Sequence, residues 1–178
     1  MCTECRKYYP EFRVSINLSY VQILKSPLMM ELKQMIDHSG ISCSGIIVEL
    51  TESGYLEGTP AVRSVWNDMK QLRIQIALDD FGTGYSNLMN ISNLEPDIVK
   101  LDRGFTLKAL SRSYEYQLMQ YVIEMVHKLN QYVCVEGVET KEDLEKIKAL
   151  GPDLIQGYYY SKPCSRNEFL KKFFCYSE

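Results

Sequence analysis

Hydrophobic and polar residues alternate in short runs, and each run is followed by a longer stretch with the spacing of a helix. In the first run Val14, Ile16 and Leu18 alternate with polar residues, as expected for a strand with one buried face. The next stretch, about 20–38, carries large aliphatic residues four positions apart, and Gly40 stands where a helix would stop. The opening of the chain therefore predicts a strand followed by a helix.

The same order repeats along the rest of the chain. Apolar or alternating runs predict strands at 12–19, 46–51, 74–78, 98–101, 132–135 and 154–160. Helical spacing predicts helices at about 20–38, 60–72, 114–130, 141–150 and 166–174, with a short helical piece near 85–93. Regular alternation argues for parallel strands joined by right-handed crossovers. The predicted fold class is α/β.

The polar faces of these strands decide between two α/β architectures. A doubly wound open sheet needs strands that are apolar on both faces. Here Ser15 and Asn17 share one face of the first strand and Lys100 shares a face with Asp102, while the opposite faces are apolar. Polar groups at the C-terminal ends of several strands are typical of the active face of a TIM-like (β/α) barrel. We therefore predict such a barrel; an antiparallel sheet with one solvated face does not suit the intervening helices.

The number of predicted units falls short of a complete barrel. A complete barrel has eight strand-helix units, and the pattern supplies about six. We expect the other two to precede residue 1, so that residues 1–9 would be the tail of a helix of that part. The 178 residues and the 46% hydrophobic content suit one domain. The expectation is a single, N-terminally truncated domain over 1–178, which alone would be unstable or would oligomerise through its open edges.

Composition and charge narrow the class of function. The formal net charge is −3 and there is no block of Lys and Arg, which argues against a polynucleotide-binding surface. No apolar run is long enough to span a membrane, and the first residues do not form an apolar signal segment, so we expect a cytoplasmic location. Cys2 and Cys5 form half of a zinc motif that nothing completes, so we interpret them as free thiols.

Two adjacent carboxylates mark the most informative stretch of the sequence. Asp79 and Asp80 end the strand at 74–78, and Gly82 and Gly84 follow at once. Successive side chains of a strand point to opposite faces, so both carboxylates can reach one ligand only if the chain bends there. We expect the glycines to supply the bend. Two carboxylates held close repel each other, and a hard divalent cation would neutralise the pair.

Other polar residues stand at the ends of the remaining strands. Singly each has a structural explanation: Asn17 could cap a helix, Glu49 could pair with a buried lysine, and Lys100 could pair with Asp102. Together they would be costly to desolvate without cations, and they suit two Mg²⁺ or Mn²⁺ ions that activate water against a phosphodiester. The complete set is Asn17, Glu49, Asp79, Asp80, Lys100, Asp102, Glu136 and Gln156.

These residues lie in six short motifs spread along the chain. The motifs are Asn17-Leu18-Ser19, Glu49-Leu50-Thr51-Glu52-Ser53, Asp79-Asp80-Phe81-Gly82-Thr83-Gly84-Tyr85-Ser86, Lys100-Leu101-Asp102-Arg103, Glu136-Gly137-Val138-Glu139-Thr140 and Gln156-Gly157-Tyr158. From about residue 10 to the C-terminus, their order and spacing resemble those of the EAL domain, the bacterial phosphodiesterase that hydrolyses cyclic di-GMP.

The resemblance implies a role for each matching position. Asn17, Glu49 and Asp79 would bind a first metal, and Asp79 with Asp80 a second. Lys100 and Asp102 would contact the attacking water and the phosphate, and Glu136 would be the general base or the residue that holds the water. Gln156 and Glu139 would line the substrate pocket. Glu52 would anchor the loop after Asp80, which in this family links metal binding to dimer contacts.

Three functions remain open at this point. The first is a cyclic di-GMP phosphodiesterase that yields the linear dinucleotide. The second is a receptor that binds the dinucleotide without cutting it, because the Glu-Ala-Leu motif, whose Glu is a metal ligand, is absent from the chain. The third is another divalent-metal barrel enzyme, such as an enolase-like lyase. The resemblance also favours a homodimer and allows an upstream sensory or diguanylate cyclase domain.

Overall fold

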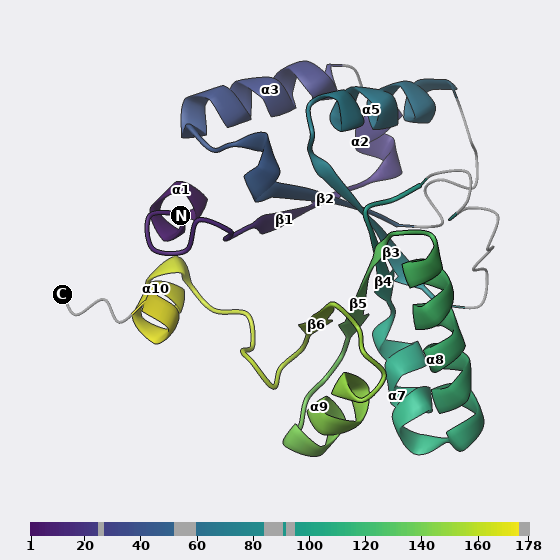
Figure 1. The fold of residues 1–178 in the computed structure, drawn as a ribbon. Helices are drawn as coiled ribbons and strands as arrows, with labels where there is room; N and C mark the ends of the chain where they lie inside the picture. The colour runs from purple at the N-terminus through teal and green to yellow at the C-terminus, as the bar shows by residue number, and fades with distance from the viewer. Residues whose placement is uncertain (25–26, 52–59, 84–90, 92–94, 175–178) are drawn as a thin grey trace.

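The computed structural model describes residues 1–24, 27–51, 60–83, 91 and 95–174. Six parallel strands form one sheet in chain order (Figure 1). They are β1 (Val14–Leu18), β2 (Ile46–Thr51), β3 (Gln75–Phe81), β4 (Ile98–Leu101), β5 (Tyr132–Glu136) and β6 (Leu154–Gln156). The helices are α1 (Cys2–Cys5), α2 (Tyr20–Leu24), α3 (Leu28–Ser39), α5 (Pro60–Gln71), α7 (Arg103–Ser111), α8 (Ser113–Lys128), α9 (Lys141–Lys148) and α10 (Arg166–Phe174), with a 3₁₀ turn at Cys43–Gly45.

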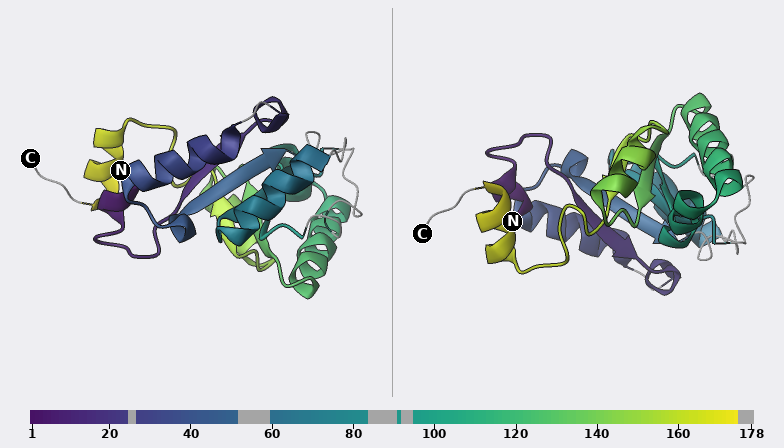
Figure 2. Two further views of the ribbon diagram at one scale, coloured as in Figure 1. Left: turned by 90° about the horizontal axis from the view of Figure 1, so that it is seen from above. Right: turned by 90° about the horizontal axis from the view of Figure 1, so that it is seen from below.

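The strand order identifies the architecture. Because each strand pairs with the next one along the chain, right-handed crossovers place the connecting helices on the same side of the sheet. Figures 1 and 2 show them ranged along that side, from α3 and α5 past α7 and α8 to α9. A doubly wound sheet would need a reversal of strand order. The predicted TIM-like α/β fold is confirmed as a curled six-stranded part of a barrel.

Most predicted elements are present, but the strand predicted over 74–78 runs on to Phe81, and three further predictions were wrong in detail. The helix predicted over 20–38 is two helices, α2 and α3, because Pro27 at the start of α3 has no amide hydrogen and cannot continue the helix before it. The strand predicted over 154–160 ends at Gln156. The helix α7 was missed. The helical piece predicted near 85–93 lies almost entirely outside the described residues.

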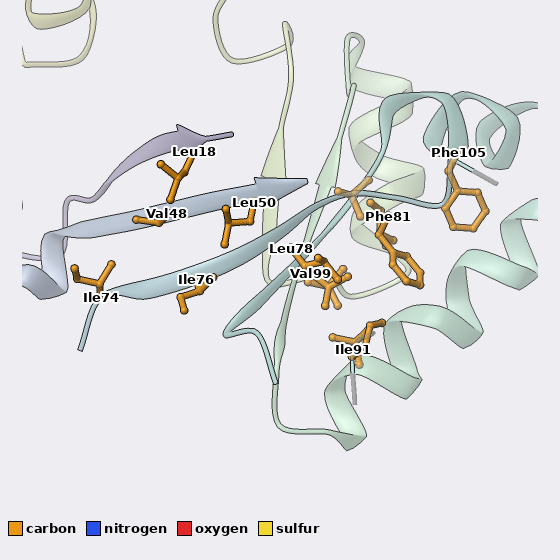
Figure 3. Close-up of a cluster of buried hydrophobic side chains, with 14 of the residues drawn as sticks. Leu18, Val48, Leu50, Ile74, Ile76, Leu78, Phe81, Ile91, Val99 and Phe105 are labelled. Carbon is orange, nitrogen blue, oxygen red and sulfur yellow. The ribbon is translucent and has the colours of Figure 1, made fainter. Parts of the chain in front are cut away.

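Two hydrophobic clusters lie on opposite faces of the sheet. The larger joins the outward side chains of the strands to the helices, and Val48, Ile76, Leu78 and Val99 are each at most 2% exposed (Figure 3). Complete burial of one such side chain contributes about 1.5–3 kcal/mol. The smaller cluster lies on the inward face and consists of Ile47, Ala77, Ile98 and Cys134. The inward face is therefore apolar low in the barrel and polar at the C-terminal ends of the strands.

The first and last helices, α1 and α10, lie side by side (Figures 1 and 2). Arg166 of α10 pairs with Glu4 of α1 at 2.5 Å, and the rings of Phe12 and Phe169 are 6.0 Å apart, edge to face. These contacts hold α10 beside the segment that leads into β1.

Within the described residues, no helix is long and apolar enough to cross a membrane.

Candidate active site

The C-terminal ends of the strands bring the predicted site residues to one rim of the sheet. Adjacent parallel strands present register partners on the same face, so the pairing of Asn17 with Glu49 and of Glu136 with Gln156 places these four side chains inward. Lys100 of β4 lies inward as well, in register with Cys134 of β5. The prediction that these residues share one face is consistent with this register.

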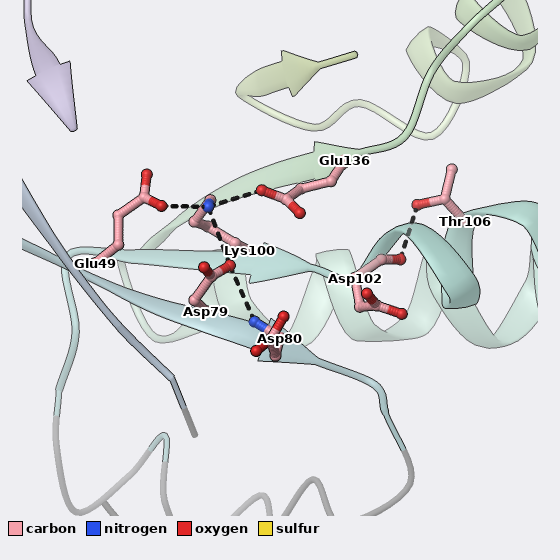
Figure 4. A network of polar contacts seen from close by, with 7 residues as sticks. All are labelled: Glu49, Asp79, Asp80, Lys100, Asp102, Thr106 and Glu136. Carbon is pink, nitrogen blue, oxygen red and sulfur yellow. Dashed lines mark hydrogen bonds and ion pairs between the residues drawn. The ribbon is translucent and has the colours of Figure 1, made fainter. Parts of the chain in front are cut away.

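Lys100 is the centre of the site (Figure 4). Its side chain is almost fully buried, and its Nζ lies 2.6 Å from Glu49 Oε2, 3.0 Å from Asp79 Oδ1 and 2.7 Å from Glu136 Oε1. The three carboxylates come from β2, β3 and β5. A buried charge is tolerated when it is paired and hydrogen-bonded, and here three acceptors surround one ammonium group. The three carboxylates therefore surround Lys100, and the four side chains together keep an excess of negative charge.

This geometry sets the protonation of Lys100 and Glu136. Burial alone would lower the pKa of Lys100, but its hydrogen bonds to Glu136 and Glu49 raise that pKa well above its ordinary value. Lys100 therefore stays positively charged at all physiological pH values. Burial raises the pKa of Glu136, and the hydrogen bond from Lys100 only partly offsets this. Glu136 thus has a higher proton affinity than an ordinary glutamate.

A β-bulge, and not the glycines alone, turns the adjacent aspartates toward the rim. Leu78 is in register with Val99 and Phe81 with Leu101, so β3 has three steps where β4 has two. The extra residue is Asp80, whose φ is +62°, and Phe81 returns to the outer core beside Leu78. We predicted that Gly82 and Gly84 would supply the bend; Gly82 has a φ of +103°, and Gly84 lies outside the described residues. The prediction was wrong in its position: Asp80 adopts the left-handed conformation itself, which aspartate tolerates better than most residues.

The two aspartates are closely coupled. The amide of Asp80 donates to Asp79 Oδ1 at 3.0 Å (Figure 4). Burial raises the pKa of Asp80, and the neighbouring charges of Asp79 and Asp102 raise it further. Asp80 is therefore held in a field of like charge, which a bound cation would relieve.

Asp102 serves the fold at the same time as it faces the site. Its Oδ1 accepts from the amide of Gly104 at 2.7 Å and so caps α7, while its own amide donates to the carbonyl of Phe81 at 2.9 Å. This cap starts a helix that has weak helical spacing of its own, which explains why α7 was missed. Two structural explanations were considered for these residues above. An ion pair between Lys100 and Asp102 is not found among the described residues, whereas an ion pair of Glu49 with a buried lysine is present.

The remaining predicted residues differ in how they are placed. Asn17 and Gln156 are exposed at the rim, on β1 and β6. Glu139 accepts a hydrogen bond from Arg103 Nη2 at 2.7 Å, a partner that the sequence did not predict. Glu52 lies outside the described residues.

Cys134 is a neighbour of the network that we also did not predict. It is 6% exposed and lines the same cavity as Lys100 and Glu49. Burial, and then the charge of Glu136, raises the pKa of its thiol to about 12, so it is neither a nucleophile nor a thiolate ligand at neutral pH. The alternation of β5 places it on the inward face beside Lys100, and that signal could have identified it.

A cavity of about 540 Å³ opens beneath the rim. Its volume falls within the usual range of ligand sites, about 300–1,000 Å³. It reaches from Lys100 and Glu49 past Gln156 to the aromatic side chains of Phe12 and Phe169. The site is therefore polar at its top and apolar at its base.

The donor set suits a hard divalent cation. Glu49, Asp79 and Asp80 offer carboxylate oxygens, the ligands that Mg²⁺, Mn²⁺ and Ca²⁺ prefer. Glu49 and Asp79 already converge within 3.0 Å of one positive group, the Lys100 ammonium. Among the described residues, no three acidic, histidine or cysteine side chains are spaced as a ready-formed metal site. The residues fit such an ion by their chemistry and charge.

Comparison with known proteins places this site in a family. The EAL domain model matches residues 1–163. The cyclic di-GMP phosphodiesterase PdeF of Escherichia coli (strain K12) is 32% identical over 160 residues, which are 90% of this chain and 21% of PdeF. A solved structure of the EAL enzyme Bd1971, bound to cAMP and cyclic di-GMP, has a TM-score of 0.88 at 29% identity and covers 96% of this chain and 45% of that one.

A third match includes a metal. Klebsiella pneumoniae BlrP1, solved as a calcium and cyclic di-GMP complex, has a TM-score of 0.81 at 25% identity and covers 89% of this chain and 41% of its own. The chain thus spans less than half the length of each of these three relatives. The model match over residues 1–163 of 178 establishes the family. This chain belongs to the EAL domain family.

Proposed function

We propose that this EAL chain hydrolyses cyclic di-GMP to the linear dinucleotide, with two Mg²⁺ or Mn²⁺ ions as cofactors. The observation that carries the proposal is the convergence of Glu49, Asp79 and Glu136 on Lys100 at the C-terminal rim of the sheet. The rim of parallel strands is where barrel enzymes place their catalytic groups. The relatives named above support cyclic di-GMP as the substrate.

The metal ligands proposed are those implied by the resemblance. Asn17, Glu49 and Asp79 would hold one ion, and Asp79 with Asp80 the other. When bound, such ions would activate a water and neutralise the charge of the phosphodiester. The bulge at Asp80 supports this assignment, because it turns a second carboxylate to the rim where strand geometry alone would allow one. The calcium complex of BlrP1 supports a divalent ion and leaves its identity to experiment.

The chain's own groups would handle the proton and the charge. Glu136, whose pKa is raised by burial, would take the proton of the attacking water. Lys100, fixed by three carboxylates and positively charged, would stabilise the negative charge that develops on the phosphate. Asp102 lies at the start of α7 beside this position and would orient the water or the phosphate. Gln156, which lines the cavity, would contact the substrate, and the resemblance implies the same contact for Glu139.

Hydrolysis by the purified chain tests this proposal. Cyclic di-GMP is incubated with the chain and Mg²⁺ or Mn²⁺, and the linear dinucleotide is measured by chromatography. Glu136→Gln removes the general base without changing its size, so we expect the rate to fall by about 10²–10⁴-fold. The control is Glu115→Gln, at a glutamate of α8 that pairs with Arg112 away from the rim. Equal rates for wild type and Glu136→Gln would contradict the proposal.

A receptor that binds cyclic di-GMP without cutting it is the second candidate. The observation that favours it is that Lys100 already neutralises part of the charge of three carboxylates. Binding of cyclic di-GMP in calorimetry, with no product in the hydrolysis assay, would select the receptor. The homodimer implied by the resemblance stays a prediction, and sedimentation of the chain tests it.

A further inference from the structure

Arg103 connects the C-terminal ends of β4 and β5, and none of the roles proposed above involves this residue. It follows Asp102 at the end of β4, and its guanidinium Nη2 lies 2.7 Å from Oε1 of Glu139, in the segment after β5. Because Glu136 ends β5, the pair connects the segment that carries Asp102 to the segment that carries Glu136. The arginine and glutamate side chains remain 59% and 39% exposed, so the pair lies at the surface of the rim.

The stem of Arg103 also fills the space beside Gly137. Gly137 has a φ of +82°, and a Cβ built on it would collide with Cγ of Arg103 and lie 3.1 Å from its Cα. Only glycine allows this conformation together with so close an approach. The aliphatic part of Arg103 therefore rests directly on the backbone that follows Glu136, in addition to the contact of its guanidinium with Glu139.

The segment under Arg103 is held on its other side by β6. The amide of Val138 donates to the carbonyl of Gln156 at 3.3 Å, and the amide of Tyr159 donates to the carbonyl of Val138 at 3.0 Å. Val138 is fully buried. The backbone from Gly137 to Glu139 is thus fixed between Arg103 and the end of β6, and Arg103 is its restraint on the β4 side.

We propose that Arg103 is a positioning residue for the hydrolysis, which holds Glu136 in place through Gly137 and Glu139. The inference rests on the proposed function. It also gives Glu139 a different task from the substrate contact implied by the resemblance, because Glu139 acts as the partner that locks Arg103 over the loop. An exposed ion pair alone contributes little to stability, so the consequence of losing it is a displaced Glu136 and not an unfolded chain.

Steady-state kinetics of cyclic di-GMP hydrolysis separates positioning from binding. Arg103→Ala is expected to lower kcat about tenfold and to leave KM within about twofold, since displacement of a catalytic group acts on the chemical step. Arg103→Lys keeps the stem and the charge and is expected to restore most of kcat. Glu139→Ala removes only the ion pair and should lower kcat by less than Arg103→Ala, and the double variant should be no slower than Arg103→Ala, because that variant already lacks the ion pair.

A matched ion pair supplies the control. Arg112 pairs with Glu115 at 3.1 Å at the start of α8, outside the rim, and Arg112→Ala is expected to keep the wild-type kcat. A rise in KM at unchanged kcat for Arg103→Ala would overturn the proposal, because Arg103 would then bind substrate directly. Additive losses in the double variant would overturn it as well.

A second readout keeps the two proposals distinguishable. If the wild-type chain releases no linear dinucleotide, the proposed function fails, and hydrogen exchange of the Val138 amide still tests the restraint. We expect that amide to exchange about tenfold faster in Arg103→Ala than in wild type or Arg112→Ala, because its segment opens more readily. Equal exchange in the three proteins would overturn the positioning role.

Discussion

The two ends of the sheet carry similar acidic residues in different states of pairing. At the N-terminal end, Asp97 precedes β4, and its Oδ2 accepts from the amide of Ile76 in β3 at 2.8 Å. Its Oδ1 lies 3.0 Å from Lys70 of α5. Asp153 repeats the arrangement before β6, with the amide of Val133 at 2.8 Å and His127 Nε2 at 2.9 Å. Each aspartate there has one strand amide and one cationic or imidazole partner.

At the C-terminal end the charges are not matched in this way. One lysine, Lys100, serves Glu49, Asp79 and Glu136, and Asp80 lies beside them with a raised pKa. The N-terminal aspartates hold neighbouring strands together, and their negative charges are paired with these partners. The C-terminal carboxylates keep uncompensated negative charge, which costs stability and is available to bind cations. The comparison suggests that one end of the sheet is built for stability and the other for function.

The largest expected effect comes from removing Lys100. Lys100→Met leaves three carboxylates buried without their shared cation, so we expect the free energy of unfolding to fall by about 3–5 kcal/mol at neutral pH. Urea denaturation followed by circular dichroism measures it. The loss should be smaller at acid pH, where Glu136, whose pKa is raised by burial, takes up a proton. A variant as stable as wild type at pH 7 would contradict the conclusion that Lys100 compensates the charge of the three carboxylates.

An intermediate effect is expected at the opposite end of the sheet. Asp97→Ala leaves the amide of Ile76 without its acceptor and removes the ion pair with Lys70, so stability should fall by about 1–3 kcal/mol. The hydrolysis rate of the folded variant should stay that of wild type, because Asp97 lies at the far end of the strands. Denaturation and the hydrolysis assay on one preparation measure both quantities. If Asp97→Ala lost hydrolysis and kept the stability of wild type, the assignment of stability to the N-terminal end and of function to the C-terminal end would be contradicted.

The smallest effect is a gain of stability at the rim. The pKa of Asp80 is raised in the folded chain, so its ionisation disfavours folding, and wild type loses stability as the pH rises from the unfolded-state pKa through the folded one. Asp80→Asn removes that charge and should stabilise the metal-free chain by up to about 1 kcal/mol at pH 7.

The gain should disappear below about pH 4, where Asp80 of the wild type binds its own proton. Thermal unfolding from pH 3 to 8 in the presence of a chelator measures it. A variant less stable than wild type at pH 7 would show that the charge of Asp80 is compensated without metal.

The sequence predicted what depends on local pattern. Short apolar runs predicted the limits of β2 and β4, and helical spacing predicted those of α10. The polar strand ends predicted which face would carry the site, because the period of a strand is two residues. The break before α3 was also readable, since Pro27 stands inside the leucine pattern.

The features that sequence reasoning missed depend on contacts between strands. The bulge at Asp80 is set by the pairing of β3 with β4, so no local signal places it at Asp80 instead of at the following glycines. The contact of Arg103 with Glu139 joins residues 36 positions apart, and only the fold brings them together. The helix α7 depends on the cap at Asp102, which the weak spacing of its own residues does not reveal.

Binding of Mn²⁺ tests most directly the claim that the rim carries charge for a cation. The chain is titrated with Mn²⁺ in calorimetry and its thermal unfolding is followed in parallel, for wild type, Asp79→Asn and Asp97→Asn. We expect Mn²⁺ to bind wild type and Asp97→Asn and to raise their unfolding temperatures, by mass action on the folded state. Asp79→Asn should lose both effects. Equal binding by Asp79→Asn and wild type, or no binding by wild type, would contradict that claim.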